Sequence, residues 1–144
     1  ITSSSMTRFN ISLLEGVNMV LWTLENAFGG EIFIPKIPSY KVVDLADAIG
    51  PSCQKKIIGI RSGEKVHEDL ITRSESSSTI DIGKYYAILP SPNFYIGKHD
   101  QKFEICFKVP EDFAYNSGKN EVFLKVNELR ELIRKHIDEN FKPY

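Results

Sequence analysis

Apolar residues spaced three and four positions apart predict a helix near the start of the chain. Ser12-Leu13-Leu14-Glu15 has the form of a capping box, in which the serine hydroxyl and the glutamate carboxylate satisfy free amide groups at a helix start. Gly29-Gly30 can end the helix in a left-handed conformation. We expect the apolar face to lie in the core, with Met19 and Trp22 at its edges. That face holds Leu13, Leu14, Val17, Val20, Leu21 and Leu24.

The pattern then changes to short apolar segments bounded by turn residues. Residues 31–34 predict a strand that Pro35 closes, and residues 44–49 predict a helix that Gly50-Pro51 ends. Residues 56–60 predict a further strand, which would place Arg61 at its carboxyl end.

The second half of the chain is less regular. A serine-rich segment predicts a flexible loop over residues 73–84, and residues 116–120 predict a turn. Residues 85–90 and 103–110 have the composition of strands. Asn127 can cap a final helix with one apolar face formed by Leu129, Leu132, Ile133, His136 and Ile137. This mixture of helices and strands predicts an α/β or α+β fold.

Composition and charge narrow the class of protein. A chain of 144 residues, 42% hydrophobic and 26% charged, fits a single globular domain over residues 1–144. The net charge of −1 argues against binding to nucleic acid. Cys53 and Cys106 have no close cysteine or histidine neighbours, which argues against a disulfide framework and a metal site and favours the cytoplasm. No apolar run is long enough to span a membrane, and we expect no membrane partner.

The clearest candidate for binding chemistry is Arg61-Ser62-Gly63-Glu64. An arginine can hold two phosphate oxygens at once, and a carboxylate three residues away can accept hydrogen bonds from ribose hydroxyls. These residue types together suit a nucleotide diphosphate. The alternative is a surface turn whose Arg61 and Glu64 form a weak exposed ion pair. A second arginine, Arg8, occurs in the similar setting Met6-Thr7-Arg8-Phe9.

Three segments together resemble a known family. Met6-Thr7-Arg8-Phe9, the stretch 29–39 (GGEIFIPKIPS) and the stretch 59–68 (GIRSGEKVHE) occur in the order found in the carboxyl-terminal part of the UDP-N-acetylglucosamine 4,6-dehydratases. Those enzymes are extended short-chain dehydrogenase/reductases that act early in the biosynthesis of pseudaminic acid-type sugars for surface glycans. The inverting branch, which converts the sugar to a 4-keto-6-deoxy product with inversion at C5, is the most similar.

The resemblance implies roles for four residues. Arg8 and Arg61 stand at the positions of the two diphosphate-binding arginines, and Glu64 stands where the family has an acidic residue that receives the ribose hydroxyls. Thr7 could add a hydroxyl contact near the first phosphate, or it could be a strand residue satisfied by the backbone. Ser62 departs from the family, which usually has proline there. Without proline the backbone before Gly63 is less preorganised, and we expect this looser turn to cost about 0.4–1 kcal/mol.

Other features of the family are missing. The sequence has no Gly-rich dinucleotide turn, and its one Tyr-x-x-x-Lys spacing, at residues 115–119, is interrupted by a turn sequence. We therefore expect no catalytic, cofactor-binding or metal-binding residue in this chain, and no role of that kind for His67, for His99 in a charged loop, or for His136, expected partly buried on the last helix. The resemblance implies a substrate-binding lobe without its Rossmann domain, inactive alone.

The intact enzyme would use NADP or NAD, bind a UDP-sugar and form a homo-oligomer. Two alternatives stay open. The chain could be a lobe of a nucleotide-sugar 4-epimerase, or a freestanding binding module without catalysis.

Overall fold

The computed structural model describes residues 1–90, 99 and 101–144. Its contacts divide the chain into two compact units, each assembled from separate stretches of sequence. Unit 1 holds Ile1–Ser12, Ile37–Glu68 and Asn116–Tyr144, and unit 2 holds Leu13–Lys36 and Asp69–Tyr115. The prediction of a single domain is left open by this division, and each unit is described by itself.

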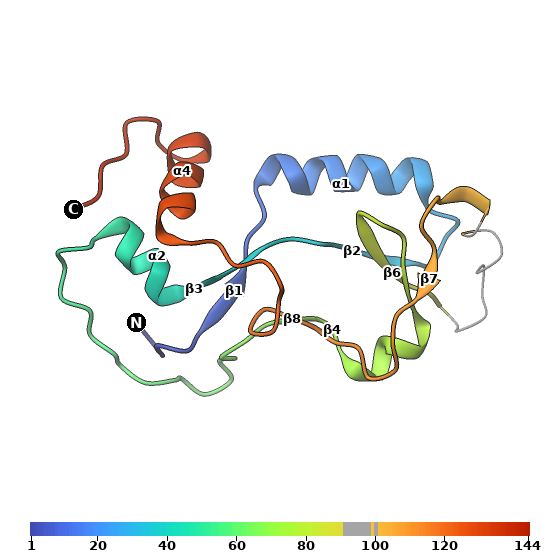
Figure 1. Cartoon of the computed structure of the whole chain (residues 1–144), viewed down its shortest axis with the longest axis horizontal. Helices are drawn as coiled ribbons and strands as arrows, with labels where there is room; N and C mark the ends of the chain where they lie inside the picture. The colour runs from blue at the N-terminus through green and yellow to red at the C-terminus, as the bar shows by residue number, and fades with distance from the viewer. Residues whose placement is uncertain (91–98, 100) are drawn as a thin grey trace. The chain divides into compact units, whose positions relative to one another are not determined.

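Unit 1 combines a two-stranded sheet with two helices (Figure 1). β1 (Thr7–Phe9) pairs antiparallel with β3 (Ser39–Lys41), and Arg8 lies opposite Tyr40. α2 (Val42–Ile49) follows β3 directly, and α4 (Val126–His136) packs against it. The guanidinium of Arg130 on α4 donates from Nε to the carbonyl of Ala48 and from Nη2 to that of Asp47, both at 3.1 Å. These bonds satisfy carbonyls that the end of α2 leaves free.

Unit 2 is built on a four-stranded antiparallel sheet with the order β2-β6-β5-β7. The register places Phe33, Ala87 and Ile80 side by side across three strands, and all three are buried. α1 covers this face, because the Trp22 ring meets Phe33 edge-on at 5.3 Å between ring centroids. The strands are β2 (Ile32–Pro35), β5 (Thr79–Asp81), β6 (Tyr85–Ile88) and β7 (Phe107–Lys108), and the helix is α1 (Leu13–Asn26).

Two smaller elements complete the described fold. β4 (Asp69–Ile71) and β8 (Tyr115–Asn116) form a two-stranded sheet. The 3-10 helix η1 (Arg73–Ser78) then leads into β5, and Thr72 and Glu75 form a capping box at its start. The segment expected as a loop over residues 73–84 thus holds η1 and β5, and its flexibility stays a prediction.

Most predicted elements are confirmed, and the fold is the expected mixture of helix and sheet. α1 begins directly after Ser12, α2 ends at Gly50, and residues 116–120 include the expected turn. β2 and β6 lie in the segments predicted as strands. The helix at the end of the chain begins at Val126, so the prediction that Asn127 caps it is wrong, and Lys125 occupies the cap.

Two other predictions from the apolar pattern are wrong, and a third is confirmed only in part. Residues 56–60 form no strand. Among the described residues their backbone contact is with Ile1 alone, through a bond from Ile58 N to Ile1 O and one from Ile1 N to Lys56 O. Backbone hydrogen bonds to the single residue Ile1 are too few to form a β-sheet. Of residues 103–110 only β7 is strand. His136 and Ile137 are exposed, because α4 turns its other side toward α2.

The expected orientation of α1 is also wrong. Met19 and Trp22, predicted at the edge of its buried face, are the residues that pack on the core. The six residues predicted to be buried instead have exposed side chains, from 46% for Val17 to 86% for Leu13. The sheet of unit 2 needs large, flat side chains against Phe33 and Tyr85, and Trp22 supplies one.

Candidate functional site

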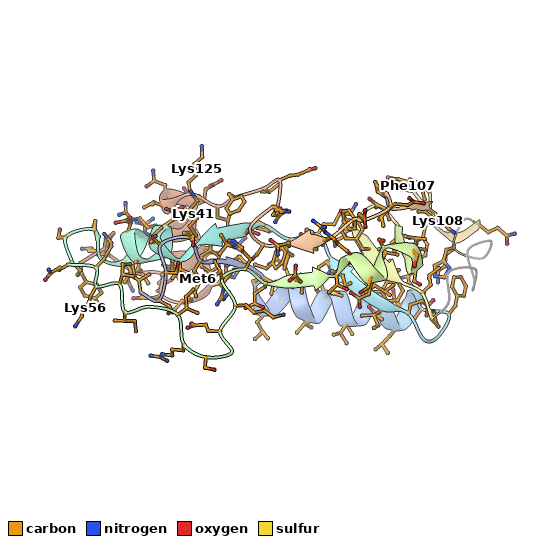
Figure 2. The ribbon with its side chains drawn as sticks, turned by 90° about the horizontal axis from the view of Figure 1, so that it is seen from below. Met6, Lys41, Lys56, Phe107, Lys108 and Lys125 are labelled. Atoms are coloured by element: carbon orange, nitrogen blue, oxygen red, sulfur yellow. The ribbon has the colours of Figure 1, made fainter. Side chains whose placement is uncertain are left out.

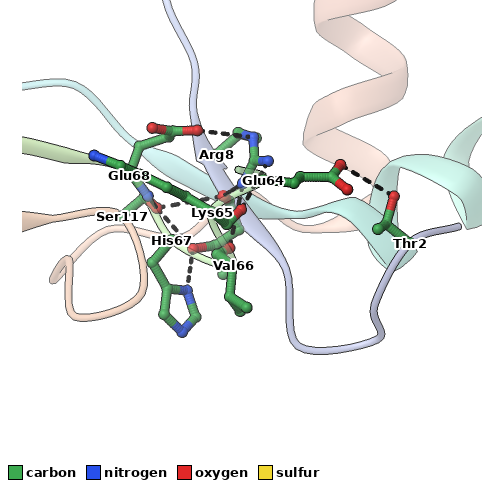
Figure 3. A network of polar contacts seen from close by, with 9 residues as sticks. Thr2, Arg8, Glu64, Lys65, Val66, His67, Glu68 and Ser117 are labelled. Atoms are coloured by element: carbon green, nitrogen blue, oxygen red, sulfur yellow. Dashed lines mark hydrogen bonds and ion pairs between the residues drawn. The ribbon is translucent and has the colours of Figure 1, made fainter. Parts of the chain in front are cut away.

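Arg61 and Glu64 are brought together by a tight turn. The backbone N–H of Glu64 donates to the carbonyl of Arg61 at 3.1 Å, and the Glu64 carboxylate accepts from the backbone N–H of Arg61 at 3.1 Å. Gly63 has a φ of 79°, a left-handed conformation that favours glycine. The other carboxylate oxygen of Glu64 accepts from the hydroxyl of Thr2 at 3.2 Å (Figure 3). The Glu64 carboxylate therefore holds the turn through Arg61 and also ties it to Thr2.

The Arg61 side chain is exposed and has no ion pair or hydrogen bond with the described residues. An arginine without an internal partner keeps all five N–H groups available to a ligand. The alternative in which Arg61 and Glu64 form an exposed ion pair does not occur in this structure, since Glu64 uses the Arg61 backbone instead.

Arg8 has a different environment. Its Nη1 donates to the carbonyls of Thr7 at 2.6 Å and Val66 at 3.2 Å, and its Nη2 donates to that of Lys65 at 3.0 Å. Nε lies 3.4 Å from the Glu68 carboxylate, in an ion pair that Figure 3 marks with a dashed line. The guanidinium thus fastens β1 to the segment that follows the Arg61 turn.

These bonds limit what Arg8 can offer a ligand. Of its five N–H groups, both on Nη1 and one on Nη2 donate hydrogen bonds, and Nε faces Glu68 in the ion pair. One N–H on Nη2 is left in this conformation. A two-pronged hold on a phosphate would require Arg8 to release at least one carbonyl or Glu68.

Thr7 is buried, with only 4% of its surface exposed. Its hydroxyl lies 2.8 Å from His67 Nδ1 and 2.7 Å from the hydroxyl of Ser117. Ser117 in turn accepts from the backbone N–H of Glu68 at 2.9 Å. Three distant stretches of unit 1 therefore meet at these hydroxyl groups. The hydroxyl of Thr7 is used in contacts within the fold, and its contact with a phosphate stays a prediction.

Gly118 allows the turn after β8 to approach His67. A Cβ at this position would lie 2.5 Å from His67 Nδ1, which is closer than side-chain atoms can come. A glycine here therefore keeps the imidazole beside Thr7.

Sequence reasoning missed this network of Thr7, His67, Glu68 and Ser117. His67 and Glu68 belong to the quoted motif 59–68, and Ser117 lies in a predicted turn. Each of these residues carries a hydrogen-bonding side chain, and this is the signal in the sequence that could have indicated a polar network. The pairing could not be found, because Thr7 and Ser117 are 110 positions apart.

A second polar pair lies in unit 2 and was also missed. His99, expected in a charged loop, is fully buried, and its Nε2 lies 3.2 Å from the Glu31 carboxylate. Burial opposes ionisation of Glu31, but the pKa of this carboxyl is held below its ordinary value by the backbone N–H groups of Phe28 and Gly29 and by His99. The contacts of Glu31 stabilise the turn between α1 and β2, so we assign Glu31 a structural role and not a binding role.

The part of the chain that the structure describes offers neither a metal site nor a membrane-spanning helix. The described residues include no group of three histidine, cysteine, aspartate or glutamate side chains that could hold a metal ion. Their helices are also too short or too polar to cross a membrane.

Comparison with known proteins decides the family. The sequence profile of the family described as polysaccharide biosynthesis protein matches residues 1–90. The chain belongs to this family. The matched residues include both arginines, Glu64 and the His67–Glu68 segment.

Individual relatives have more specific names. The chain is 47% identical to a UDP-N-acetylglucosamine 4,6-dehydratase (inverting) of Campylobacter jejuni, over 92% of this chain. It is 35% identical to a UDP-glucose 4-epimerase of Rickettsia felis over the same share. Among solved structures, Pen from Bacillus thuringiensis superposes with a TM-score of 0.75 at 28% identity over 94% of this chain.

Each of these proteins is much longer than the region that it shares with the 144-residue chain. The chain spans 41% of the Campylobacter enzyme, 40% of the Rickettsia enzyme and 40% of the Bacillus structure. The 144 residues therefore correspond to one part of such proteins.

Proposed function

We propose that this chain is the substrate-binding lobe of an inverting UDP-N-acetylglucosamine 4,6-dehydratase, a lyase. The observation that carries the proposal is the 47% identity to such an enzyme over 92% of the chain, well above the 35% to an epimerase. The product would be a 4-keto-6-deoxy UDP-sugar with C5 inverted, used in pseudaminic acid-type surface glycans. The two cysteine thiols suit a cytoplasmic location, and a homo-oligomer is part of the proposal.

In this proposal the Arg61 turn is the nucleotide-binding element. The exposed guanidinium of Arg61 would pair with the diphosphate, and the Glu64 carboxylate would accept hydrogen bonds from the ribose hydroxyls. Glu64 can do this while holding the turn, because a carboxylate has about four lone-pair sites and the structure uses two. Arg8 would contribute its remaining N–H, and Thr7 would act near the first phosphate. Such contacts hold the hexose in reacting geometry.

The residues present do not fit a dinucleotide cofactor. A site for NADP or NAD needs a glycine-rich turn between a strand and a helix start, and the sequence has none. We propose that a Rossmann domain, which the relatives' additional length could supply, holds the cofactor. This lobe would then contribute binding, orientation and no proton transfer.

The experiment uses a chimera in which the remaining part of the Campylobacter enzyme precedes this chain. A charge-assisted contact contributes roughly 1.5–3 kcal/mol, so Arg61→Ala should raise KM for UDP-N-acetylglucosamine about ten- to a hundredfold. Glu64→Gln should have a milder effect, because an amide oxygen still accepts. Arg73→Ala is the matched control, since Arg73 is also an exposed arginine and lies on η1. Equal KM values for Arg61→Ala and Arg73→Ala would refute the diphosphate role.

The second candidate is a lobe of a nucleotide-sugar 4-epimerase, which the match to the Rickettsia enzyme favours. The product separates the two activities. Proton NMR would show a new C6 methyl signal for a dehydratase, and a C4 epimer without loss of water for an epimerase. The test uses the full-length protein to which this chain belongs, because the catalytic part of the chimera comes from a dehydratase. Formation of the epimer by that protein would contradict the dehydratase proposal.

A further inference from the structure

Helix α1 is apolar on two opposite sides. The inner side places Met19 and Trp22 on the core of unit 2. The outer side carries six aliphatic residues, which we call the outer stripe of α1, and each is between 46% and 86% exposed. Figure 2 shows a row of side chains projecting from α1 on the side away from its sheet. The outer stripe consists of Leu13, Leu14, Val17, Val20, Leu21 and Leu24.

This arrangement differs from that of an ordinary surface helix. Such a helix buries one apolar stripe and presents polar residues on the opposite side. Exposed aliphatic side chains are unremarkable when scattered, but six of them on one face of a helix mark an interaction surface. The spacing of Val17, Val20, Leu21 and Leu24 keeps them on one face over two turns.

Two observations favour one partner for the outer stripe. The chain spans only 41% of the dehydratase it matches, so most of such a polypeptide lies outside these 144 residues and is available to cover this helix. A second copy of the chain is a poorer partner. α1 carries Glu15 and Glu25 and no basic residue, so a symmetric pair of α1 helices would bring carboxylates together without a cation on either helix.

We propose that the outer stripe of α1 is the docking surface for the nucleotide-binding lobe, the part of the dehydratase polypeptide that these 144 residues do not include. This inference rests on the proposed function as far as the identity of that lobe is concerned. Burial of the stripe against the lobe would remove aliphatic surface from water, which stabilises the assembled enzyme.

The first test measures access to the stripe. Val20→Cys is introduced into the isolated chain and into the chimera with the Campylobacter enzyme, and maleimide labelling of that peptide is followed by mass spectrometry, with labelling in denaturant as reference. The labelling rate should fall by at least about tenfold in the chimera. Equal rates would overturn the proposal. Protection in the isolated chain together with dimerisation would overturn it as well, because a second copy would then cover the stripe.

The second test adds a charge to the stripe. Leu21→Asp should lower the melting temperature of the chimera and reduce binding of a hydrophobic dye to the isolated chain, without unfolding that chain, since Leu21 is 55% exposed. Asn18→Asp is the matched control, because it adds the same charge to an exposed polar position of α1. Unchanged dye binding and melting by Leu21→Asp would refute the docking surface.

These readouts are independent of turnover. A folded but inactive chimera in which α1 is protected supports the docking surface and contradicts the proposed activity. An active chimera with α1 still open to the maleimide supports the activity and overturns the docking surface.

Discussion

At the scale of single residues, the two arginines have unequal environments. Arg61 is exposed on a turn closed by Glu64, whereas Arg8 donates to three carbonyls and pairs with Glu68. The sequence motifs indicated both residues but could not distinguish their environments. Hydrogen bonds from a guanidinium to backbone carbonyls do not depend on the identity of the neighbouring side chains, so the sequence does not reveal them. Whether both contact a diphosphate stays a prediction. In this structure Arg8 has the geometry of a residue that positions the segment after the Arg61 turn.

The hydroxyl cluster beneath Arg8 allows a prediction about stability. Ser117→Ala removes a fully buried hydroxyl that accepts from Glu68 N and contacts the Thr7 hydroxyl. A buried donor left without a partner costs about 1–3 kcal/mol, so the free energy of unfolding should fall by that amount. Urea denaturation measures it. Ser52→Ala is the control, because Ser52 is exposed in the same unit and should change little. Equal effects of both substitutions would show that the cluster adds no stability.

At the scale of helices and strands, local sequence rules were reliable where an element is determined by its own residues. α1, α2 and β2 lie where capping, spacing and Pro35 place them. The rules failed where a partner decides. Residues 56–60 have the apolar content of a strand, but a strand exists only beside another one, and among the described residues they bond to Ile1 alone.

The orientation of α1 failed for a related reason. The apolar spacing predicted that this face lies in the core, and the structure leaves the face exposed. Apolar spacing shows that a helix face is suited to burial but not which surface buries it. A helix with apolar residues on two opposite sides, such as α1, therefore has two possible orientations on its sheet.

The turn between α1 and β2 provides a prediction of pH dependence. Glu31 accepts from the N–H groups of Phe28 and Gly29, and its pKa lies below the ordinary value in the folded chain. Stabilisation by a carboxylate with a lowered pKa is complete above the unfolded pKa of about 4.3 and is lost as the pH falls through the folded value. Glu31→Gln should therefore destabilise the chain at pH 7 and much less at pH 3. The upper limit at pH 7 is the roughly 1.5–3 kcal/mol of a hydrogen bond to a charged group, because the amide oxygen of Gln still accepts.

Chemical denaturation at the two pH values tests this. Glu25→Gln serves as the control, because it makes the same change at an exposed position of α1. A destabilisation by Glu31→Gln that is as large at pH 3 as at pH 7 would mean that the ionised form contributes nothing.

At the scale of the whole molecule, the chain is a family member of partial length. It matches the polysaccharide biosynthesis protein family over residues 1–90 and spans about two fifths of its relatives. The resemblance found from motifs in the sequence is confirmed at this level. The division into two compact units was not foreseen, since it depends on contacts between stretches that are distant in sequence.

The third prediction concerns activity. The 144-residue chain alone should not convert UDP-N-acetylglucosamine, with either NAD or NADP added, because it has no glycine-rich turn and its Tyr115 and Lys119 are separated by a turn. Proton NMR of the reaction mixture is the measurement, with the intact Campylobacter enzyme as the positive control. A sugar product above the level of a boiled sample would show that the lobe is catalytic by itself.

The meeting of Thr7 and Ser117 has a consequence for synthesis of the chain. Thr7 leaves the ribosome before Ser117, and its hydrogen-bond partner follows 110 residues later. Closing a loop of that length is entropically costly and slow compared with forming a helix. Until Ser117 emerges, Arg8 and the Arg61 turn have only part of their final support. The support of the candidate nucleotide-binding element is thus completed late, and a nascent chain halted before residue 117 would lack the Ser117 contacts.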